Sequence, residues 1–257
     1  MSALRYDIGF DLDDPRTTLA HRDIIRAKPF LERLYKEWYG DFIDRISNVP
    51  PGELLEIGSG GGFLKELIPQ VITSDVMPLD CCEMTFSAER MPFHDGELSA
   101  VMMLNVFHHI PRPWMFLQEA ERTLKTGGKV VMTEPANSLM GRFIYRNFHH
   151  EPFEPEGAWE IAPGGPLSGS NQALPFIYFE RDRAESEKRF PCLRINAIRY
   201  HTPFRYVLSG GVSRKALVPN STFGFFKGLE SLLAPLSRWL GLFMTVELEK
   251  VDGRGSR

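Results

Sequence analysis

Three glycines at alternate positions, Gly58, Gly60 and Gly62, follow a short apolar run at residues 54–57. Glycines let backbone N–H groups approach a ligand closely, and the start of a following helix favours anionic or electron-rich groups. Because residues 63–68 are compatible with a helix, the stretch predicts a buried parallel strand, a tight turn and a helix. By itself, such a turn is a weak indication of a nucleotide-type site.

An acidic residue, Glu56, lies on the predicted strand, two positions before the first glycine. A buried carboxylate is costly unless a donor pairs with it, and the ammonium group of a ligand would serve. The dinucleotide-binding pattern G-x-G-x-x-G is not matched, because Phe63 stands where its third glycine would be. Both features separate this turn from a dinucleotide site.

A second strand-like segment, residues 71–76, contains Asp75 near its end. In a doubly wound sheet this carboxylate lies beside the first turn, where it can accept both hydroxyls of an adenosine ribose. The alternative is that Asp75 only begins the turn before Pro78. With the glycine turn in register, the ribose role is favoured.

The strand with Glu56 and its glycine turn resembles motif I of the class I S-adenosylmethionine-dependent methyltransferases, and Asp75 supports this resemblance. It implies an α/β fold with a doubly wound, seven-stranded Rossmann-like sheet and S-adenosylmethionine as the cofactor. Glu56 would engage the cofactor's ammonium directly or through water, Asp75 would hold its ribose, and the turn would lie beneath its methionine part. The cofactor-binding residues implied by the resemblance are Glu56, Gly58, Ser59, Gly60, Gly62, Asp75, Val76, Ser87, Ala88, Glu89 and Asn105.

Residues 87–93 resemble the family's D-A-x-x-L-P-F segment, in which a side chain and a backbone N–H read the adenine. Ser87 stands where the family usually has aspartate. Its hydroxyl can still hydrogen-bond the adenine amino group, although without charge assistance. Ala88 and Glu89 match the segment and would border the adenine.

Residues 98–104 predict a buried strand, the fourth of the sheet, followed by Asn105. The next residues, with His108 and His109, resemble the L-H-H-V segment of the Methyltransf_11-type branch. Ligands of open α/β sheets bind outside the carboxyl ends of the strands, so Asn105 is expected near the methyl donor. The histidines either supply a general base, or hydrogen-bond the loop and touch the methionine moiety. The second interpretation is favoured, with His109 the better candidate for a functional role.

Residues 114–124 predict an amphipathic helix that the glycine pair 127–128 ends, followed by a fifth strand at 130–135. Together these segments resemble the family's K-P-G-G signature with its closing E/D-P. The reaction implied is in-line transfer of a methyl group from a sulfonium to an O, N or C nucleophile. A catalytic base is needed only if the acceptor is protonated and weakly acidic, and the candidates are His109 and Glu134.

The run His149-His150-Glu151 is a separate set of polar side chains. It could contact a substrate, supply a base or, in principle, bind a metal ion. No third cluster of ligand residues supports a metal here, and the adjacent Cys81 and Cys82 have no second Cys/His pair nearby. No metal site is predicted, and a solvated helix end is the favoured interpretation.

The chain divides into an N-terminal arm and helical cap (1–48), a methyltransferase domain (49–251) and a flexible tail (252–257). Within the domain lies an insertion at about 136–192 that is rich in proline, glycine and aromatic residues. A long irregular segment in a compact domain is either functional or disordered, and its aromatic content argues against disorder. We expect it to form the lid and the acceptor region.

Helical periodicity at residues 18–46 predicts two helices divided by Pro29. Their aromatic stripe could close over a cofactor, but packing onto the sheet is favoured. The apolar stretch 223–240 could touch a membrane or a lipid-like acceptor, but burial as a sheet-covering helix is favoured because its polar face is thin. Alternating segments at 193–200 and 243–251 predict the antiparallel pair that ends the sheet.

The composition is ordinary for a globular protein, with 43% hydrophobic and 25% charged residues among 257. A net charge of −3 gives no global field that favours a phosphate backbone, so no nucleic-acid partner is expected. The three cysteines indicate a reducing compartment, and no signal peptide or transmembrane segment is recognisable, which predicts a cytoplasmic location. Peripheral membrane contact is disfavoured, and the oligomeric state is not predicted.

The sequence therefore predicts S-adenosylmethionine-dependent methyl transfer to a small or medium-sized acceptor, such as a saccharide or a lipid-linked precursor. One alternative is a non-catalytic cofactor-binding or regulatory protein of the same fold, since fold does not fix function. A nicotinamide-dependent oxidoreductase is the less favoured alternative, because Phe63 and Glu56 depart from the dinucleotide pattern.

Overall fold

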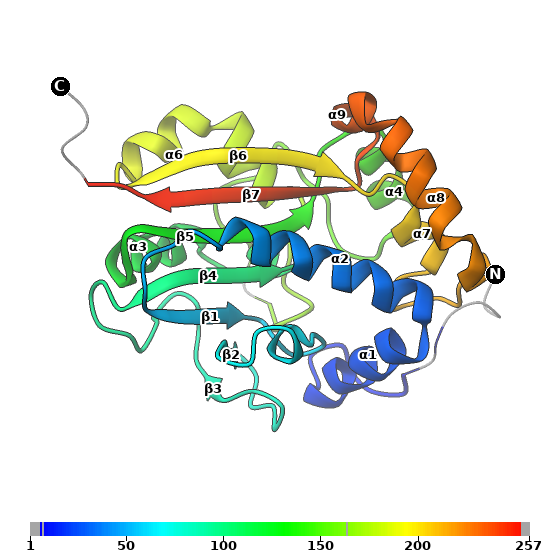
Figure 1. The fold of residues 1–257 in the computed structure, drawn as a ribbon, viewed down its shortest axis with the longest axis horizontal. Coiled ribbons are helices and arrows are strands. Elements are labelled where there is room, and N and C mark those ends of the chain that lie inside the picture. The colour runs from blue at the N-terminus through cyan, green and yellow to red at the C-terminus, as the bar shows by residue number, and fades with distance from the viewer. Residues whose placement is uncertain (1–5, 7, 163, 253–257) are drawn as a thin grey trace.

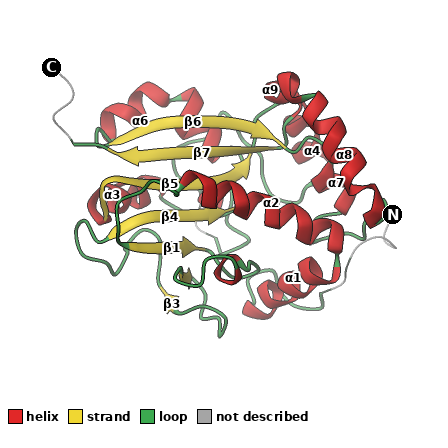
Figure 2. Ribbon diagram, viewed as in Figure 1, coloured by secondary structure: helices red, strands yellow, loops and turns green. Residues whose placement is uncertain are grey.

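The computed structural model describes residues 6, 8–162 and 164–252, and its central element is a seven-stranded sheet (Figures 1 and 2). The strands are β1 (Glu53–Ile57), β2 (Ile72–Asp75), β3 (Met84–Thr85), β4 (Leu98–Leu104), β5 (Leu124–Pro135), β6 (Leu193–His201) and β7 (Phe243–Lys250). Their order is β3-β2-β1-β4-β5-β7-β6, with β1 to β5 parallel and β7 antiparallel to both neighbours. The predicted doubly wound, Rossmann-like sheet is confirmed, including its antiparallel final pair.

Helices cover both faces of the sheet and one of its ends (Figure 1). The α-helices are α1 (Pro15–Ala27), α2 (Pro29–Arg45), α3 (Pro113–Thr123), α4 (Leu139–Phe148), α5 (Leu174–Phe176), α6 (Arg183–Arg189), α7 (Arg205–Ser209), α8 (Phe223–Leu232) and α9 (Ser237–Leu240). In Figure 1, α1, α4, α7 and α8 gather at the end toward which β1, β4 and β5 point. This end is the carboxyl edge of the parallel strands, where ligands of open α/β sheets bind.

The two faces of the sheet carry separate apolar layers. On one face, Phe116 and Leu117 of α3 pack with Val101 of β4. On the other, the aromatic side chains of α2 are buried, and the ring centroid of Trp38 lies 4.8 Å from that of Phe243 in β7. The prediction that the aromatic stripe packs onto the sheet is therefore confirmed.

The two N-terminal helices divide at Pro29, as predicted. The Asp14 side chain caps α1 by accepting a hydrogen bond from the backbone N–H of Arg16, and α2 begins with Pro29. A proline suits the first turn of a helix because its missing N–H would be unpaired there in any case. The break lets α1 lie at the carboxyl edge while α2 runs along the sheet (Figure 1).

The predicted helix at residues 63–68 is wrong. A single 3-10 turn, η2 (Leu64–Glu66), follows the glycine turn, and β2 begins soon afterwards at Ile72. Pro69 explains the shortening, because a proline disfavours a helical residue before it and cannot donate a hydrogen bond within a helix.

The glycine pair 127–128 does not end a helix, contrary to prediction. Helix α3 ends at Thr123, and β5 begins directly at Leu124. The glycines lie within β5, where its register with β4 shifts and where Gly127 has a φ of 82°. A left-handed residue at a strand irregularity is a position that suits glycine.

The apolar stretch 223–240 is not the buried, sheet-covering helix that the sequence predicts. It forms α8, α9 and a short turn between them, and Phe225 and Leu232 are 70% and 78% exposed. Helix α8 is held by Phe223 and Glu230, which are buried. Among the described residues, no helix combines the length and the apolar character that crossing a membrane requires.

The predicted flexible tail, residues 252–257, falls almost entirely outside the described part of the chain. Asp252 is described, and its Oδ1 accepts a hydrogen bond of 2.9 Å from the Thr126 hydroxyl. Residues 253–257 lie outside the described residues.

Candidate active site

The glycine turn after β1 lies between α1 and the end of β2. Gly58 has a φ of 70°, and a Cβ there would collide with the side chain of Val106. A Cβ on Gly60 would collide with the methyl group of Thr18 in α1 and lie 2.9 Å from Asp75 Oδ2. Both positions therefore require glycine, one for its backbone conformation and both for close approach.

Glu56 of β1 is a buried carboxylate with an unused acceptor. The residue is 3% exposed, and its Oε2 has no hydrogen-bond partner among the described residues. Burial raises the pKa of the Glu56 carboxyl to about 7, and the charge of Asp75 acts in the same direction. A cationic group at this position would remove the cost of the buried charge.

Asp75 ends β2 beside the turn, where the sequence places it. Its Oδ2 accepts a hydrogen bond of 3.2 Å from Gly60 N, and its Oδ1 accepts one of 3.0 Å from Met77 N. Burial raises the pKa of the Asp75 carboxyl, and these N–H donors oppose the rise. Asp75 thus begins the following turn, as the alternative interpretation predicts, and its contact with a ribose stays a prediction.

The segment predicted to read adenine is tied to β2 through its backbone. Phe86 N donates a hydrogen bond of 3.1 Å to the Asp75 carbonyl. Ser87 Oγ accepts one of 3.2 Å from Glu89 N, and the Glu89 carboxylate pairs with Arg112 at 2.7 Å. Both polar side chains therefore have local partners. Two other predicted cofactor residues differ in exposure. Ala88, in the same segment, is buried, whereas Val76, directly after β2, is exposed.

The end of β4 carries a second unused acceptor. Asn105 adopts a left-handed backbone with a φ of 57°, held by a hydrogen bond of 2.9 Å from its N–H to the Thr133 carbonyl. Within the described chain, the buried Oδ1 of Asn105 has no partner. A strained residue with an unpaired buried oxygen is typical of a ligand-binding position rather than of plain packing.

Glu134, at the end of β5, organises the loop that follows β4. Its Oε1 accepts hydrogen bonds of 2.8 Å from both Val106 N and Phe107 N, and its Oε2 lies 2.6 Å from His108 Nδ1. Burial alone lowers the pKa of His108, but the charge of Glu134 outweighs it and raises this pKa to about 9. The fully buried Glu134 carboxylate is thus engaged by three donors.

His109 keeps a ring nitrogen that faces another side chain. Its Nδ1 lies 3.1 Å from the Gly169 carbonyl, which makes Nδ1 the donor. Burial lowers the pKa of His109 to about 4, so the ring is neutral and Nε2 carries a lone pair. This Nε2 lies 3.8 Å from Glu151 Oε1.

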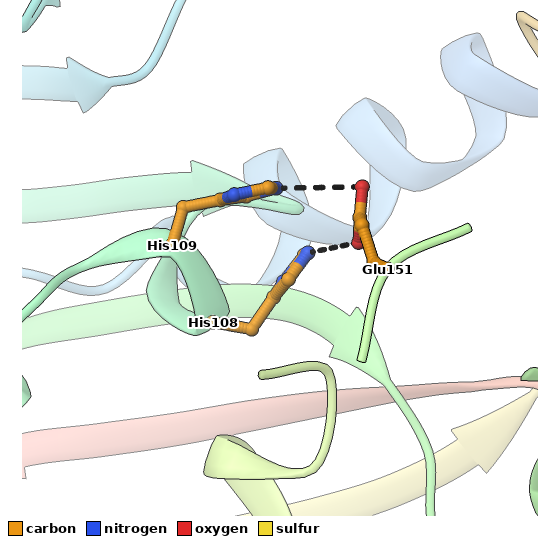
Figure 3. Close-up of side chains that lie close together, drawn as sticks. All are labelled: His108, His109 and Glu151. Carbon is orange, nitrogen blue, oxygen red and sulfur yellow. Dashed lines mark ion pairs between the residues drawn. The ribbon is translucent and has the colours of Figure 1, made fainter. Parts of the chain in front are cut away.

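Glu151 comes from the insertion and completes a cluster at the carboxyl edge. Figure 3 shows His108 and His109 both pointing toward its carboxylate, and His108 Nε2 lies 3.4 Å from Glu151 Oε2. Burial raises the pKa of Glu151, but the hydrogen bond and charge of His108 outweigh it and leave this pKa well below its usual range. The adjacent His149 Nδ1 lies 3.9 Å from the same carboxylate.

Sequence reasoning missed how these residues meet. The sequence favours a solvated helix end for His149-His150-Glu151, whereas in the structure Glu151 lies against the histidines that follow β4. Only the long-range fold brings the two segments together. The sequence shows both histidine-containing runs, His108-His109 and His149-His150-Glu151, but their spacing does not indicate that they are in contact.

The insertion packs over the loop after β4. Asn171 N donates a hydrogen bond of 3.0 Å to the His108 carbonyl, and Ile161 N donates one of 3.1 Å to the Pro111 carbonyl. Near the N-terminus, Asp13 Oδ1 accepts hydrogen bonds from two backbone N–H groups of the insertion. The insertion is therefore fixed against both the sheet edge and the arm before α1.

A cavity of about 240 Å³ opens beside the glycine turn. Arg22 of α1 and Thr73 of β2 line this cavity. Four of the predicted cofactor residues line it as well: Glu56, Ser59, Gly60 and Gly62. The contribution of Arg22 itself was not predicted, because this residue of α1 belongs to no recognisable motif.

Comparisons with known proteins agree with this architecture. The family described as "Methyltransferase domain" matches residues 55–132, which hold the turn, Asp75, Asn105 and the histidines. A search of the curated proteins found no match. The resemblance to class I S-adenosylmethionine-dependent methyltransferases is thereby confirmed at the level of domain and fold.

Two solved structures illustrate the shared fold. Geranyl diphosphate C-methyltransferase from Streptomyces coelicolor A3(2), solved with Mg²⁺, geranyl diphosphate and S-adenosyl-L-homocysteine, is 13% identical, with a TM-score of 0.54 over 86% of this chain and 82% of that one. A SAM-dependent methyltransferase from Archaeoglobus fulgidus is 16% identical, with a TM-score of 0.51 over 85% of this chain and 94% of that one. At these identities the similarity concerns the fold.

Proposed function

We propose that this chain binds S-adenosylmethionine at the carboxyl edge of its sheet and transfers the methyl group to a small or medium-sized acceptor through an O, N or C nucleophile. The observation that carries the proposal is Oε2 of Glu56, which is buried beside the glycine turn and Asp75 and has no hydrogen-bond partner in the part of the chain that the structure describes. A buried carboxylate in this position calls for a cationic partner, and the cofactor's ammonium is one.

The residues present fit the cofactor. Considering the described residues alone, three buried oxygens in this region, on Thr18, Glu56 and Asn105, have no hydrogen-bond partner, and a ligand with several donors could satisfy them. Glu56 would hold the ammonium, Asp75 the ribose hydroxyls, and Ala88 with Glu89 would border the adenine. When bound, S-adenosylmethionine supplies an electrophilic methyl group on its sulfonium. The chain's own contribution is to orient the reactants and exclude water.

The acceptor would lie on the side of the histidine cluster. There the insertion at 136–192 would form the lid and acceptor region, and residues 1–48 would cap the cofactor side. Of the two candidate bases, Glu134 is engaged by three donors, which favours a positioning role for it. His109 keeps its Nε2 lone pair toward the cluster and is the better candidate for a base.

Methyl transfer itself is tested by measuring S-adenosylhomocysteine formed from S-adenosylmethionine with a panel of acceptors. The panel should contain hydroxylated and amino-bearing small molecules, saccharides and lipid-linked precursors. We expect product with at least one acceptor, and none with a Glu56→Gln variant at the same cofactor concentration. Tight binding of S-adenosylhomocysteine without turnover across a broad panel would instead favour a non-catalytic binding protein.

The raised pKa of Glu56 predicts a pH-dependent affinity for S-adenosylhomocysteine. Below about pH 7 the free carboxyl holds a proton that it must release to pair with the ligand's ammonium. The association constant should therefore rise by up to about ten-fold per pH unit until about pH 7 and then level off. Titration calorimetry in buffers of different ionisation heat measures both the affinity and the released proton. A profile that is flat between about pH 5.5 and 7 would contradict this role of Glu56.

A Glu56→Gln variant provides the matched control for this titration. Its affinity should be lower and independent of pH over that range. A carboxyl with a raised folded pKa destabilises the fold as pH rises from its unfolded value of about 4.5 to about 7. Without ligand, the variant should therefore unfold at a higher temperature than the original chain above pH 7, which shows that weaker binding does not result from misfolding.

A further inference from the structure

His108, His109 and Glu151 form a group of ligand atoms that converge on one point. One ring nitrogen of each histidine and a carboxylate oxygen all lie within 4.8 Å of one another. The two histidine Nε2 atoms lie 3.4 and 3.8 Å from the two oxygens of Glu151 (Figure 3). Atoms that lie about 2.0–2.2 Å from one ion are roughly 3–4 Å apart, and both histidine–carboxylate distances fall in that range.

Both imidazoles are held in the orientation that metal binding requires. His108 Nδ1 lies 2.6 Å from the Glu134 carboxylate, and His109 Nδ1 lies 3.1 Å from the Gly169 carbonyl. Each Nδ1–H thus has an acceptor, which leaves Nε2 as the atom that faces Glu151. Metal-bound histidines in proteins characteristically donate their other N–H to a carboxylate or a backbone carbonyl in this way.

The burial and the carboxylates of the cluster also favour a bound cation. The side chains of His108 and Glu151 are 3% and 14% exposed, and Glu134 behind them is fully buried. Glu134 and Glu151 bring two carboxylates to the imidazoles of this cluster, and their negative charge favours a bound cation. Buried carboxylates in proteins are paired with positive groups or bind metal ions.

We propose that His108 Nε2, His109 Nε2 and the Glu151 carboxylate bind one divalent transition-metal ion. Two imidazoles and one carboxylate suit Zn²⁺ or another first-row transition metal, whereas Mg²⁺ and Ca²⁺ prefer sites made of oxygen. Three protein ligands leave at least one coordination position open, as in zinc sites that bind a substrate or water. Glu134 is a positioning residue that orients His108 and touches no metal.

The open position suggests the class of acceptor, and this step rests on the proposed function. The cluster follows β4, on the same loop as Asn105, where the sequence places the methyl donor. The ion would bind an oxygen of the acceptor, such as a hydroxyl, and lower its pKa. With the ion bound, His109 Nε2 would be a metal ligand instead of a base, and the proton of the acceptor hydroxyl would pass to solvent water. The ion-binding site itself does not depend on this step.

Equilibrium dialysis of the full, tag-free chain after removal of metal with a chelator tests the site. We expect about one Zn²⁺ per chain, little Mg²⁺ at the same free concentration, and visible absorption bands of tetrahedral or five-coordinate Co²⁺ when Co²⁺ replaces Zn²⁺. His109→Ala and Glu151→Gln should each weaken Zn²⁺ binding at least about 100-fold, and Glu134→Gln about 10- to 100-fold. The exposed His94 provides the matched control, since His94→Ala should leave binding unchanged.

Two results would overturn the proposal: no stoichiometric Zn²⁺ or Co²⁺ on the original chain, or binding that His109→Ala and Glu151→Gln leave intact. Circular dichroism of the metal-free variants checks that weaker binding does not reflect unfolding. Failure of the metal site and failure of the proposed function are distinguishable. Methyl transfer by metal-free protein would contradict the role of the ion in holding the acceptor, whereas stoichiometric Zn²⁺ without any binding of S-adenosylhomocysteine would leave the site standing and contradict the proposed function.

Discussion

Replacing Asp75 with alanine will weaken binding of S-adenosylhomocysteine by about 100- to 10,000-fold. The proposed ribose contacts are two hydrogen bonds to a charged acceptor, each worth about 1.5–3 kcal/mol, and each 1.4 kcal/mol corresponds to a factor of about ten. The substitution also removes the acceptor for Gly60 N and Met77 N, which together hold the turn. Titration calorimetry at a fixed pH measures the loss.

Two further variants separate these contributions of Asp75. Asp75→Asn keeps the shape and one acceptor oxygen, so it should retain part of the turn while losing the charge-assisted ribose contacts. Asp80→Ala is the matched control, because Asp80 is an exposed aspartate five positions along the chain and should change affinity little. An Asp75→Ala chain that is folded and binds S-adenosylhomocysteine within about three-fold of the original would contradict the ribose role.

Replacing Glu134 with alanine will lower the free energy of unfolding by about 3–5 kcal/mol, the cost typical of breaking a buried ion pair. The change leaves Val106 N, Phe107 N and His108 Nδ1 without their acceptor in a fully buried site. Each of these donors then loses its protein acceptor. Urea-induced unfolding of the metal-free protein measures the difference.

A graded series sharpens the test of Glu134. Glu134→Gln keeps an oxygen for the backbone donors and should cost less than alanine, because only the charge beside His108 is lost. Glu185→Ala, at an exposed glutamate of α6, should stay within about 0.5 kcal/mol of the original chain. If the Glu134→Ala and Glu185→Ala chains are equally stable, Glu134 does not organise the loop after β4.

The parts of the molecule that sequence predicts best are those fixed by short stretches of chain. The strand with Glu56, the tight glycine turn after it and the position of Asp75 beside that turn were all predicted from one short stretch of chain. The break between the first two helices at Pro29 is likewise local. At two of these positions a backbone requirement leaves few residue types that can serve: Gly58 needs a positive φ, and Pro29 stands where a helix needs no N–H.

The parts that sequence does not predict depend on which surfaces meet. Glu151 and His108 come from segments far apart, so their contact is invisible in either segment. The exposure of Phe225 in α8 has the same origin, because an apolar helix pattern does not say whether anything covers it. The missing helix after the glycine turn is a different case, because its cause, Pro69, is local and disfavours a helical residue before it.

The most direct test of the proposed function is thermal unfolding of the chain with S-adenosylhomocysteine and, separately, with NADH. A ligand at about 100 times its dissociation constant stabilises by about 2.7 kcal/mol, which is roughly 5–10 °C for a chain of this size. We expect such a rise with S-adenosylhomocysteine and none with NADH. A rise with NADH alone, or no rise with S-adenosylhomocysteine at millimolar concentration, would contradict the proposed cofactor site.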